Sequence, residues 1–564
     1  MSLEDRLDAF GRGWRGPALA AAVALAAGLP GLLALPPLDR DEARFAEASA
    51  QMLESGDFVS IHFQGQPRFK KPVGVYWLQA AAVSTLSHVE DRDIWAYRVP
   101  SLIGAMLAAA ACAWGAAAFL APGAALAAGS MLGASFILAT EAGIAATDGV
   151  LCGAVTLAMA AMARIYVRAD QPCPAGWPTR TLFWAGLSLA VLVKGPIGPM
   201  VALLAMVALV AWDRRAAWLG RMGWGWGLIL MAVVIGPWAM AITVATDGAF
   251  WSAAVGGDLA PKLAGSAEGH GAPPGYYGLL VPLLIFPATL LLPAGLVAGW
   301  RARAEPGVRF ALCWLVPAWL VFEAVPTKLV HYTLPLYGAV AWLMACALAR
   351  PPGRIAAWSG AALSLLAACA FAAVGPLAMS SLGDWSGAGW ALLAGALFLG
   401  AGGAGAALIL RRRSRRALLV AGALALAGHA VLAAGVAPAL GPLWLTDRTA
   451  DALAESGGDP RDGIVSGPVT VAGFAEPSLV FLLGADTRLG DGSDAAEAIA
   501  QGRPAIVESR DDAAFRNALV AQATRARIVA AIPGLDYSNG RHDILRIYLP
   551  LGAATAPHPP DAKR

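Results

Sequence analysis

Charged residues are scarce in this sequence of 564 residues: only 14% are Asp, Glu, Lys or Arg, whereas 58% are apolar. A soluble globular chain carries about a quarter charged residues, so the composition excludes an ordinary soluble protein and indicates a membrane protein. The formal net charge is only +3, and no basic run is interleaved with aromatic residues. These two observations exclude nucleic acid as a partner.

Cysteine is also rare, and the 6 that are present are scattered without metal-ligand spacing. We therefore expect no disulfide and no cysteine-bound metal. The sequence also lacks an i,i+4 pair of histidines and an H-E-x-x-H motif. Glycine, by contrast, occurs 64 times, which is typical of closely packed membrane helices, where small side chains let backbones approach.

Long apolar runs fill most of the chain up to residue 445. A membrane-crossing helix needs about 20 predominantly apolar residues, and on this basis the sequence predicts about thirteen of them. The first, over 17–35, is expected to be an uncleaved helix because many more spans follow. The other predicted spans are 98–120, 123–140, 147–167, 181–194, 196–212, 224–245, 276–299, 309–324, 332–349, 355–377, 387–410 and 417–439.

Arginine is distributed unevenly between the loops. Alternate loops are basic, for example around Arg164, Arg214 and Arg301, and the positive-inside rule places these loops in the cytoplasm. The first long loop, about 38–97, then lies on the periplasmic side. Because the predicted number of spans is odd, everything after about residue 445 lies there as well.

The tail from Asp447 onward is charged and contains no predicted span. It alternates short β-rich runs with helical patterns, which favours a small α/β domain outside the cytoplasm. The predicted organisation is therefore a transmembrane domain over 1–445 and a periplasmic α/β domain over 446–564. The tail's predicted strands are 463–469, 479–483, 505–508, 528–532 and 544–549, and its predicted helices are 494–501 and 511–522.

Polar motifs interrupt the apolar sequence at six places, and all six fall on the predicted non-cytoplasmic side. This one-sided clustering favours a single functional site at that face. The six motifs lie at 39–44, 70–72, 147–148, 194–196, 258–277 and 328–332.

The segment 38–77 is the most polar stretch of the N-terminal half. Carboxylates beside a cationic cluster at a membrane surface suit chemistry on a phosphorylated lipid, because phosphate takes charge-assisted contacts from Lys and Arg. The alternative is an ordinary solvated loop in which Arg44 and Lys71 anchor the chain at lipid headgroups. Asp148 is either a second acid of the site or a helix-terminal charge stabilised by the helix dipole. His270 and His331 are metal ligands or, as we favour, ordinary hydrogen-bonded histidines.

Seven stretches of the sequence carry a resemblance to a known family. They are DEARFAEASAQMLESGDF (41–58), KKPVGVYW (70–77), ATDG (146–149), KGPIG (194–198), GHGAPPGYY (269–277), KLVHYTLPLY (328–337) and FAEPSLVFLLG (474–484). With these motifs, the chain resembles the bacterial aminoarabinose transferase family over nearly its full length. These are integral-membrane sugar transferases of the GT-C fold, related to protein O-mannosyltransferases. The first stretch is the most specific.

The resemblance implies a role for individual residues. Asp41 corresponds to a catalytic carboxylate and Asp148 to a second acid, and Arg44, Lys71 and Tyr332 would hold the phosphate of the donor. In the family the position before Lys71 is commonly acidic and helps to bind a metal. Here it is Lys70, which puts a divalent cation in doubt, and no other cofactor is implied. Residues with an implied or possible supporting role are Glu42, Lys194, His270, Tyr277, Lys328 and His331.

The function implied by the resemblance is transfer of a sugar from a polyprenyl (undecaprenyl) phosphate to lipid A or another envelope glycan. The reaction would take place at the periplasmic face of the bacterial inner membrane. Two alternatives stay open: a protein O-glycosyltransferase acting on Ser or Thr, and a transporter of a lipid-linked sugar. Transporters place charges near the bilayer midplane and often contain inverted repeats. Here the charges lie at one face and no repeat is visible, so transport is the least favoured.

Overall fold

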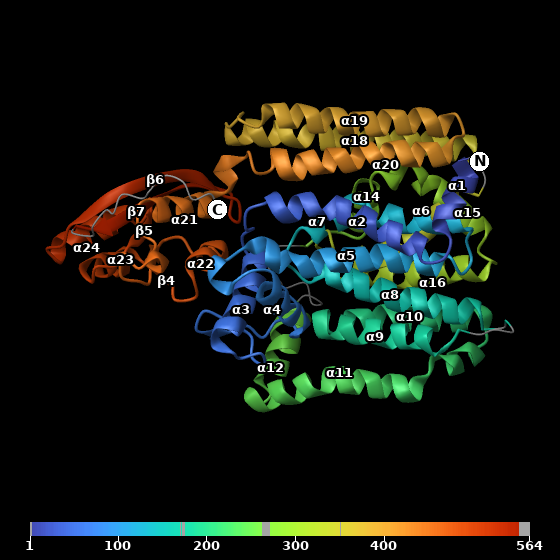
Figure 1. Ribbon diagram of the computed structural model, residues 1–564, viewed down its shortest axis with the longest axis horizontal. Coiled ribbons are helices and arrows are strands. Elements are labelled where there is room, and N and C mark those ends of the chain that lie inside the picture. The colour runs from blue at the N-terminus through green and yellow to red at the C-terminus, as the bar shows by residue number, and fades with distance from the viewer. Residues whose placement is uncertain (1–2, 170, 172–174, 262–270, 350, 552–564) are drawn as a thin grey trace.

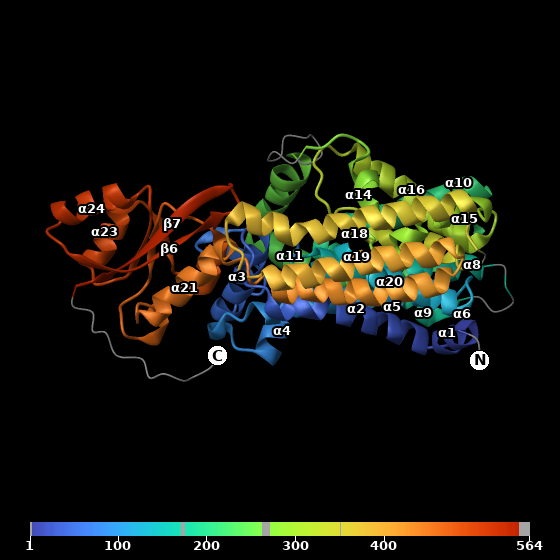
Figure 2. The same ribbon diagram turned by 90° about the horizontal axis from the view of Figure 1, so that it is seen from above.

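The structure is a computed structural model that describes residues 3–169, 171, 175–261, 271–349 and 351–551. Its long helices lie side by side in an elongated bundle, and a β-sheet with its own helices extends from one end of that bundle (Figure 1). Helix α1 (Leu3–Gly11) lies at the opposite end, as both views show (Figures 1 and 2).

Helix covers every one of the predicted apolar segments. The bundle is formed by α2 (Arg15–Ala34), α5 (Ile94–Ala116), α6 (Pro122–Gly133), α7 (Phe136–Ala142), α8 (Asp148–Val167), α9 (Trp177–Lys194), α10 (Ile197–Asp213), α11 (Trp224–Ala245), α14 (Tyr276–Leu284), α15 (Leu292–Arg301), α16 (Pro306–Ala324), α17 (Tyr337–Cys346), α18 (Arg354–Leu382), α19 (Ala388–Leu410) and α20 (Ser414–Val431).

Fewer helices than predicted are straight and long enough to cross a bilayer. Among the described residues, 8 helices meet this test, or up to 10 if each of two bent pairs is one span. The pairs are α6 with α7, bent by 59°, and α14 with the helix after it, bent by 114°. The chain is therefore a multi-pass membrane protein, but a count of thirteen crossings is not confirmed. Apolar length alone does not reveal a bend inside a run.

Close backbone contact between α5 and α8 forms the centre of the bundle. A Cβ atom added at Gly104 would lie 2.5 Å from the carbonyl oxygen of Gly149, and one at Gly153 would lie 2.5 Å from that of Gly104. No residue larger than glycine fits at this crossing without a shift of backbone. The contact places the first turn of α8, which begins at Asp148, against the N-terminal half of α5.

The segment predicted as the first loop contains two helices. After α2 the chain forms α3 (Asp41–Ser55), a short hairpin of β1 (His62–Phe63) and β2 (Gln66–Pro67), and α4 (Gly74–Leu86). These elements lie at the end of the bundle that carries the sheet (Figure 1).

A buried ion pair fixes the start of α3. The guanidinium of Arg98 contacts both carboxylate oxygens of Glu42, with its Nε 2.8 Å from Oε1 and its Nη2 2.7 Å from Oε2. Arg98 also donates to carbonyl oxygens at the end of α2, including that of Leu35. The backbone N–H of Ala145, just before α8, donates to Glu42 Oε1 at 2.7 Å. One pair of side chains thus joins α2, α3, α5 and the turn before α8.

The chain after Trp444 forms a five-stranded mixed sheet in the order β4-β3-β5-β7-β6. Strand β3 is parallel to β4 and β5, and β7 is antiparallel to β5 and β6. The strands are β3 (Thr470–Ala472), β4 (Arg488–Gly490), β5 (Ala505–Glu508), β6 (Ala526–Asp536) and β7 (Arg541–Pro550), and the helices are α21 (Leu445–Glu455), α22 (Pro477–Leu483), α23 (Gly492–Ala500) and α24 (Asp512–Ala521). We call this part of the structure, residues 445–551, the C-terminal unit.

Two predictions for the tail are wrong. The run 479–483, predicted as a strand, lies in α22. The run 463–469 contains no strand, and β3 begins directly after it at Thr470. Pro477 occupies the first turn of α22, where a missing N–H has no consequence. The short apolar run is buried on two sides. In such a run the spacing of apolar residues does not distinguish a strand from a helix. The predicted strands at 505–508, 528–532 and 544–549 are strands, and both predicted helices are helical.

The C-terminal unit packs on the first-loop helices through α22. The ring of Phe481 meets that of Tyr97 edge-on, with centroids 5.2 Å apart, inside an apolar cluster that includes Ala43 and Ala46 of α3. The side-chain amide of Gln64 donates to the carbonyl oxygen of Thr487 at 2.7 Å. The unit therefore adjoins the segment that carries Asp41.

Removing one member of the Glu42–Arg98 pair should destabilise the fold strongly. Glu42→Gln leaves the guanidinium of Arg98, which is 0% exposed, without its counter-charge. Loss of one partner of a buried pair costs about 3–5 kcal/mol, so we expect a large fall in the unfolding temperature of the detergent-solubilised protein. The control is Glu4→Gln, which removes an exposed partner of Arg415 and should cost less than about 1 kcal/mol. Equal falls in the two variants would contradict this role.

Candidate functional site at the sheet end of the bundle

Asp41 is the first residue of α3 and presents its carboxylate to solvent. The side chain is 73% exposed. Arg44 Nη1 lies 3.9 Å from its Oδ1, and Arg68 Nη2 lies 4.0 Å from the same atom. At these distances the guanidiniums form ion pairs with the carboxylate but no hydrogen bonds. The carboxylate oxygens can therefore still accept a hydrogen bond from a substrate.

A cavity of about 430 Å³ is lined in part by Arg44 and Arg68, the two arginines next to Asp41. Its lining includes the cations Arg44, Arg68 and Lys70 and, among the described residues, the single carboxylate of Asp258. That carboxylate is 2.7 Å from Lys71 Nζ. Arg68 is largely buried, with its guanidinium 5.2 Å from the centre of the Phe45 ring. Excess positive charge in a partly enclosed space suits an anion such as phosphate.

Asp148 is buried at the start of α8 and forms the centre of a second cluster. Lys194 Nζ lies 2.6 Å from its Oδ1, and the hydroxyl of Thr147 donates to its Oδ2 at 3.0 Å. His331 Nε2 is 3.7 Å from the same Oδ2. Lys194 ends α9 and His331 lies in the turn before α17, so three separate parts of the bundle meet at this carboxylate.

Glu141 and Tyr332 complete this cluster. His331 Nδ1 lies 3.4 Å from Glu141 Oε1, and the Lys194 ammonium is 5.3 Å from the centre of the Tyr332 ring. Burial lowers the pKa of His331, but the carboxylates of Asp148 and Glu141 outweigh burial and raise its pKa above the ordinary value. The pKa of His331 is therefore raised, because two carboxylates stabilise its protonated form.

Tyr332 lies within electrostatic range of both clusters. Burial raises its pKa to about 12, and nearby carboxylates add to the effect. These carboxylates are those of Asp148, Asp258 and Asp41. The two acids that were predicted to act together, Asp41 and Asp148, thus belong to different clusters. Both act electrostatically on the hydroxyl of Tyr332.

The residues present do not support a metal at position 70, because a lysine side chain is not a metal ligand when protonated. Elsewhere, Glu141, Asp148 and His331 offer ligand atoms that all lie within 4.8 Å of one another. Asp148, however, already holds the Lys194 ammonium at 2.6 Å, and a cation placed there would compete with that charge. We therefore interpret the group as a charge network and derive no chemical step through a metal.

Of the remaining predicted residues, Glu42 and Lys328 hold the structure around the site. Glu42 is engaged by Arg98, as described above. Lys328 Nζ donates to the carbonyl oxygens of Ala272 and Val325 at 2.9 and 2.7 Å. Tyr277 is buried in the first turn of α14. His270 lies outside the described residues.

Arg68 and Glu141 were not predicted. Glu141 is the only acid between Asp93 and Asp148 in a long apolar stretch, and an ionisable group in such a stretch is a functional candidate. That signal was present in the sequence. Arg68 shares its loop with Lys70 and Lys71, and no pattern in the sequence separates it from an ordinary surface arginine.

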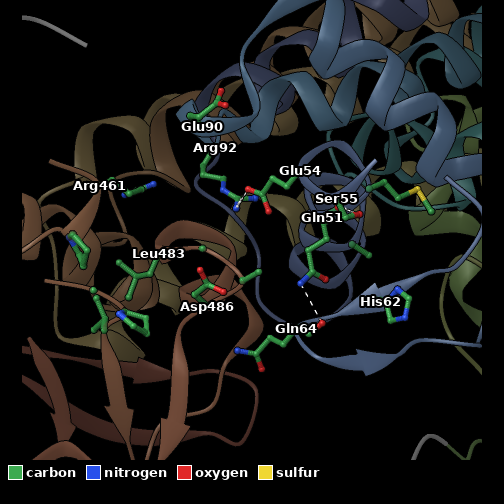
Figure 3. Close-up of a pocket in the computed structure, with 18 of the residues that line it drawn as sticks. Gln51, Glu54, Ser55, His62, Gln64, Glu90, Arg92, Arg461, Leu483 and Asp486 are labelled. Atoms are coloured by element: carbon green, nitrogen blue, oxygen red, sulfur yellow. Dashed lines mark hydrogen bonds and ion pairs between the residues drawn. The ribbon is translucent and has the colours of Figure 1, made fainter. Parts of the chain in front are cut away.

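A second, larger cavity of about 1000 Å³ lies between α3 and the C-terminal unit (Figure 3). Its lining includes four carboxylates, and Arg92 in its wall is itself 2.6 Å from Glu54. These carboxylates are Glu54, Asp57, Glu90 and Asp486. Such a lining disfavours phosphate. Gln64 lines both cavities, so the acidic and the cationic spaces adjoin.

Comparison with known sequences gives consistent relatives. Residues 38–252 match the family described as dolichyl-phosphate-mannose-protein mannosyltransferase. An undecaprenyl phosphate-alpha-4-amino-4-deoxy-L-arabinose arabinosyl transferase from Pseudomonas paraeruginosa is 29% identical over 317 residues, which are 55% of each chain. The protein of that name from Edwardsiella ictaluri is 30% identical over 332 residues, 58% of this chain and 57% of its own. The chain thus matches little more than half the length of these relatives.

Solved structures extend the similarity to nearly the whole chain. The crystal structure of ArnT from Cupriavidus metallidurans bound to undecaprenyl phosphate has a TM-score of 0.77 at 19% sequence identity, over 96% of this chain and 99% of that chain. The apo state of the same protein has a TM-score of 0.74 at 19% identity, over 94% and 97% of the two chains. At this identity the likeness shows the fold, so the chain is a multi-pass membrane protein with the GT-C fold. The fold and the named relatives both support the resemblance to ArnT-like transferases noted in the sequence.

The raised pKa of His331 predicts a pH-dependent stability. Protonated His331 stabilises the fold fully below its unfolded pKa of about 6.5. This contribution is lost as the pH rises through the higher pKa of the folded state. We expect the unfolding temperature of the wild type to fall above about pH 6.5 and His331→Gln to reduce that dependence. Scanning fluorimetry across pH measures the effect, with exposed His88→Gln as the control. The idea fails if both variants follow the wild-type profile.

Proposed function

We propose that this chain transfers a sugar from a polyprenyl phosphate to lipid A or another envelope glycolipid, at the periplasmic face of the bacterial inner membrane. The observation that carries the proposal is the exposed carboxylate of Asp41 between two arginines, beside a cavity with excess positive charge. This arrangement offers a base or orienting group next to an anion site. The relatives named as arabinosyl transferases support the same reaction.

The cationic cavity is the better place for the donor phosphate. Its lining includes Arg44, Arg68 and Lys70, whereas the larger cavity is lined by four carboxylates. A polyprenyl phosphate leaves as an anion, and positive charge fixed beside the leaving oxygen lowers the barrier by stabilising the charge that develops there. Arg44, which lines the cavity, is assigned to this role. Lys71, which pairs with Asp258 of the lining, and Tyr332, which lies within electrostatic range of Asp258, are assigned to it as well.

Asp41 acts on the acceptor. Its exposed carboxylate accepts a hydrogen bond from the attacking hydroxyl and takes its proton as the bond to the sugar forms. If the acceptor is a phosphate, Asp41 only orients it. Direct displacement inverts the configuration at the sugar carbon. Asp148, buried and paired with Lys194, acts by fixing charge and geometry in the neighbouring cluster.

Protein O-glycosylation is the second candidate, and the match of residues 38–252 to the protein mannosyltransferase family favours it. The two functions use the same class of donor, a polyprenyl-phosphate sugar, and differ in acceptor. Purified protein in liposomes is given radiolabelled undecaprenyl-phosphate 4-amino-4-deoxy-L-arabinose with either lipid A or a Ser/Thr-rich peptide. Label on lipid A supports the proposal, and label on the peptide supports the alternative. Label that crosses the bilayer unchanged would indicate transport and overturn both.

Asp41→Asn should leave the protein folded and remove nearly all transfer. The side chain is 73% exposed, so its charge contributes little to stability, and we expect an unchanged unfolding temperature. Initial rates of label transfer provide the measurement, and Asp91→Asn, an exposed acid at the same end of the bundle, is the matched control. Activity within about threefold of wild type, a barrier change below about 0.7 kcal/mol, would move the catalytic role elsewhere.

The adjacent lysines should differ in their effect on turnover. Lys71 has a side chain only 19% exposed and neutralises the acid of the cationic cavity. Its loss removes a partly desolvated charge and leaves Asp258 facing the donor phosphate, so Lys71→Ala should lower kcat/KM by about tenfold to a hundredfold.

Lys70 is exposed, and its charge is screened by water and salt. Lys70→Ala should therefore stay close to wild type, even though Lys70, unlike Lys71, is one of the residues that line the cavity. Lys71→Arg should recover part of the activity, since a planar guanidinium replaces a compact ammonium. Equal losses in the two alanine variants would show that the pair acts as a diffuse patch of charge.

A further inference from the structure

The segment before Asp41 is bound by the C-terminal unit, which is almost 500 positions away in the chain. The backbone N–H of Asp39 donates to Tyr537 Oη at 2.6 Å, across a sequence separation of 498 residues. The hydroxyl of Ser478, in α22, donates to the carboxyl group of Asp39. Both groups of the C-terminal unit therefore contact the residue two positions before Asp41.

The next residue is bound by the same turn. Arg40 Nη2 donates to the carbonyl oxygen of Ser538 at 3.1 Å and lies 4.0 Å from Glu476. Tyr537 and Ser538 lie in the tight turn between β6 and β7. The backbone N–H of Ser538 donates to Asp536 at 3.0 Å, and its hydroxyl donates to Glu476. The turn that receives the segment is thus itself braced.

The backbone of Arg40 shows that the segment needs external support. Its φ is 63° and its ψ is −105°, a combination that residues with a side chain rarely adopt. Such conformations persist only where surrounding contacts determine them, and they cluster at functional sites. On the other side, Glu42 is fixed by Arg98. Asp41 therefore lies between two anchored points, one provided by the C-terminal unit and one by the bundle.

We propose that the C-terminal unit positions the catalytic carboxylate, with Ser478 and Tyr537 as positioning residues that hold Asp39 and the unusual backbone at Arg40. The proposal rests on the assignment of Asp41 under the proposed function. Without these contacts the backbone at Arg40 relaxes to a common conformation, and Asp41 at the first position of α3 changes direction relative to Arg44 and Arg68. A displacement of about 1 Å at a catalytic group lowers rates by about a hundredfold.

The charges around Asp39 give this contact a pH dependence. Burial raises the pKa of Asp39 to about 7, Ser478 and Tyr537 oppose this shift, and Glu476 and Asp536 add to it. The unfolded pKa is near 3.9, so the docked form binds the extra proton. The contact is therefore strongest at low pH and weakens as the pH rises through about 7. Arg40 and Arg44 are the cations that act on Glu476, and both lower its pKa.

Tyr537→Phe tests the proposal because it removes one hydroxyl and keeps the ring. We expect kcat for label transfer to fall by about tenfold or more while KM for the donor changes by less than about threefold. The matched control is Tyr548→Phe, in strand β7 of the same unit, which removes a hydroxyl that donates to Asp512 of α24 and should leave kcat unchanged. Ser478→Ala should resemble Tyr537→Phe, and Ser478→Thr, which keeps a hydroxyl, should recover part of the activity.

Hydrogen–deuterium exchange over residues 38–44 provides a readout that does not depend on activity. Exchange should be faster in Tyr537→Phe than in wild type. After correction for intrinsic rates, it should also rise in wild type between about pH 6 and pH 8 and become flat in Asp39→Asn. Unchanged exchange and unchanged kcat in Tyr537→Phe would overturn the proposal. Faster exchange with normal kcat would overturn the positioning role if Asp41→Asn is inactive. If Asp41→Asn is itself active, the catalytic assignment has failed, and exchange alone decides whether the unit holds the segment.

Discussion

The buried pair of Glu42 and Arg98 is the interaction on which the rest of the site depends. Its atoms are withdrawn from water, and the cost of that burial is offset only because the guanidinium and carboxylate share two hydrogen bonds and further backbone partners. The pair fixes the first turn of α3 against α5 and the turn before α8. As a consequence, Asp41 and Asp148, which begin these two helices, are held at one end of the bundle.

The end of the bundle that this pair fixes contains two adjoining cavities of opposite charge. The smaller one has excess positive charge and the larger one is lined by carboxylates. Because Gln64 borders both, the two spaces meet at that residue, and an anionic group is favoured in the smaller space and disfavoured in the larger one. The charges of the lining residues therefore favour one orientation of a ligand that carries an anionic group at one end.

The sequence allowed most of the fold to be predicted, because apolar length is a strong signal of membrane helices. The 114° bend after α14 was not predicted, because a straight helix and a bent one can have the same apolar sequence. The cluster of Asp148, Lys194, His331 and Tyr332 was foreseen as a set of polar motifs on one face. Its partner Glu141 was missed although it interrupts an apolar stretch. The pairing of Lys71 with Asp258, 187 positions apart, is set by tertiary packing alone and leaves no trace in either local sequence.

The different burial of the two acids separates their chemistry. Asp148 is 5% exposed and holds an ammonium at 2.6 Å, so its lone pairs are engaged and its charge is fixed by neighbours. Asp41 is exposed, and its two guanidiniums lie at about 4 Å, close enough to stabilise its charge and too far to occupy its oxygens. A group that must accept a proton from a substrate needs free lone pairs in reach of that substrate. Of the two, only Asp41 meets this condition, and its position depends on contacts from both the bundle and the C-terminal unit.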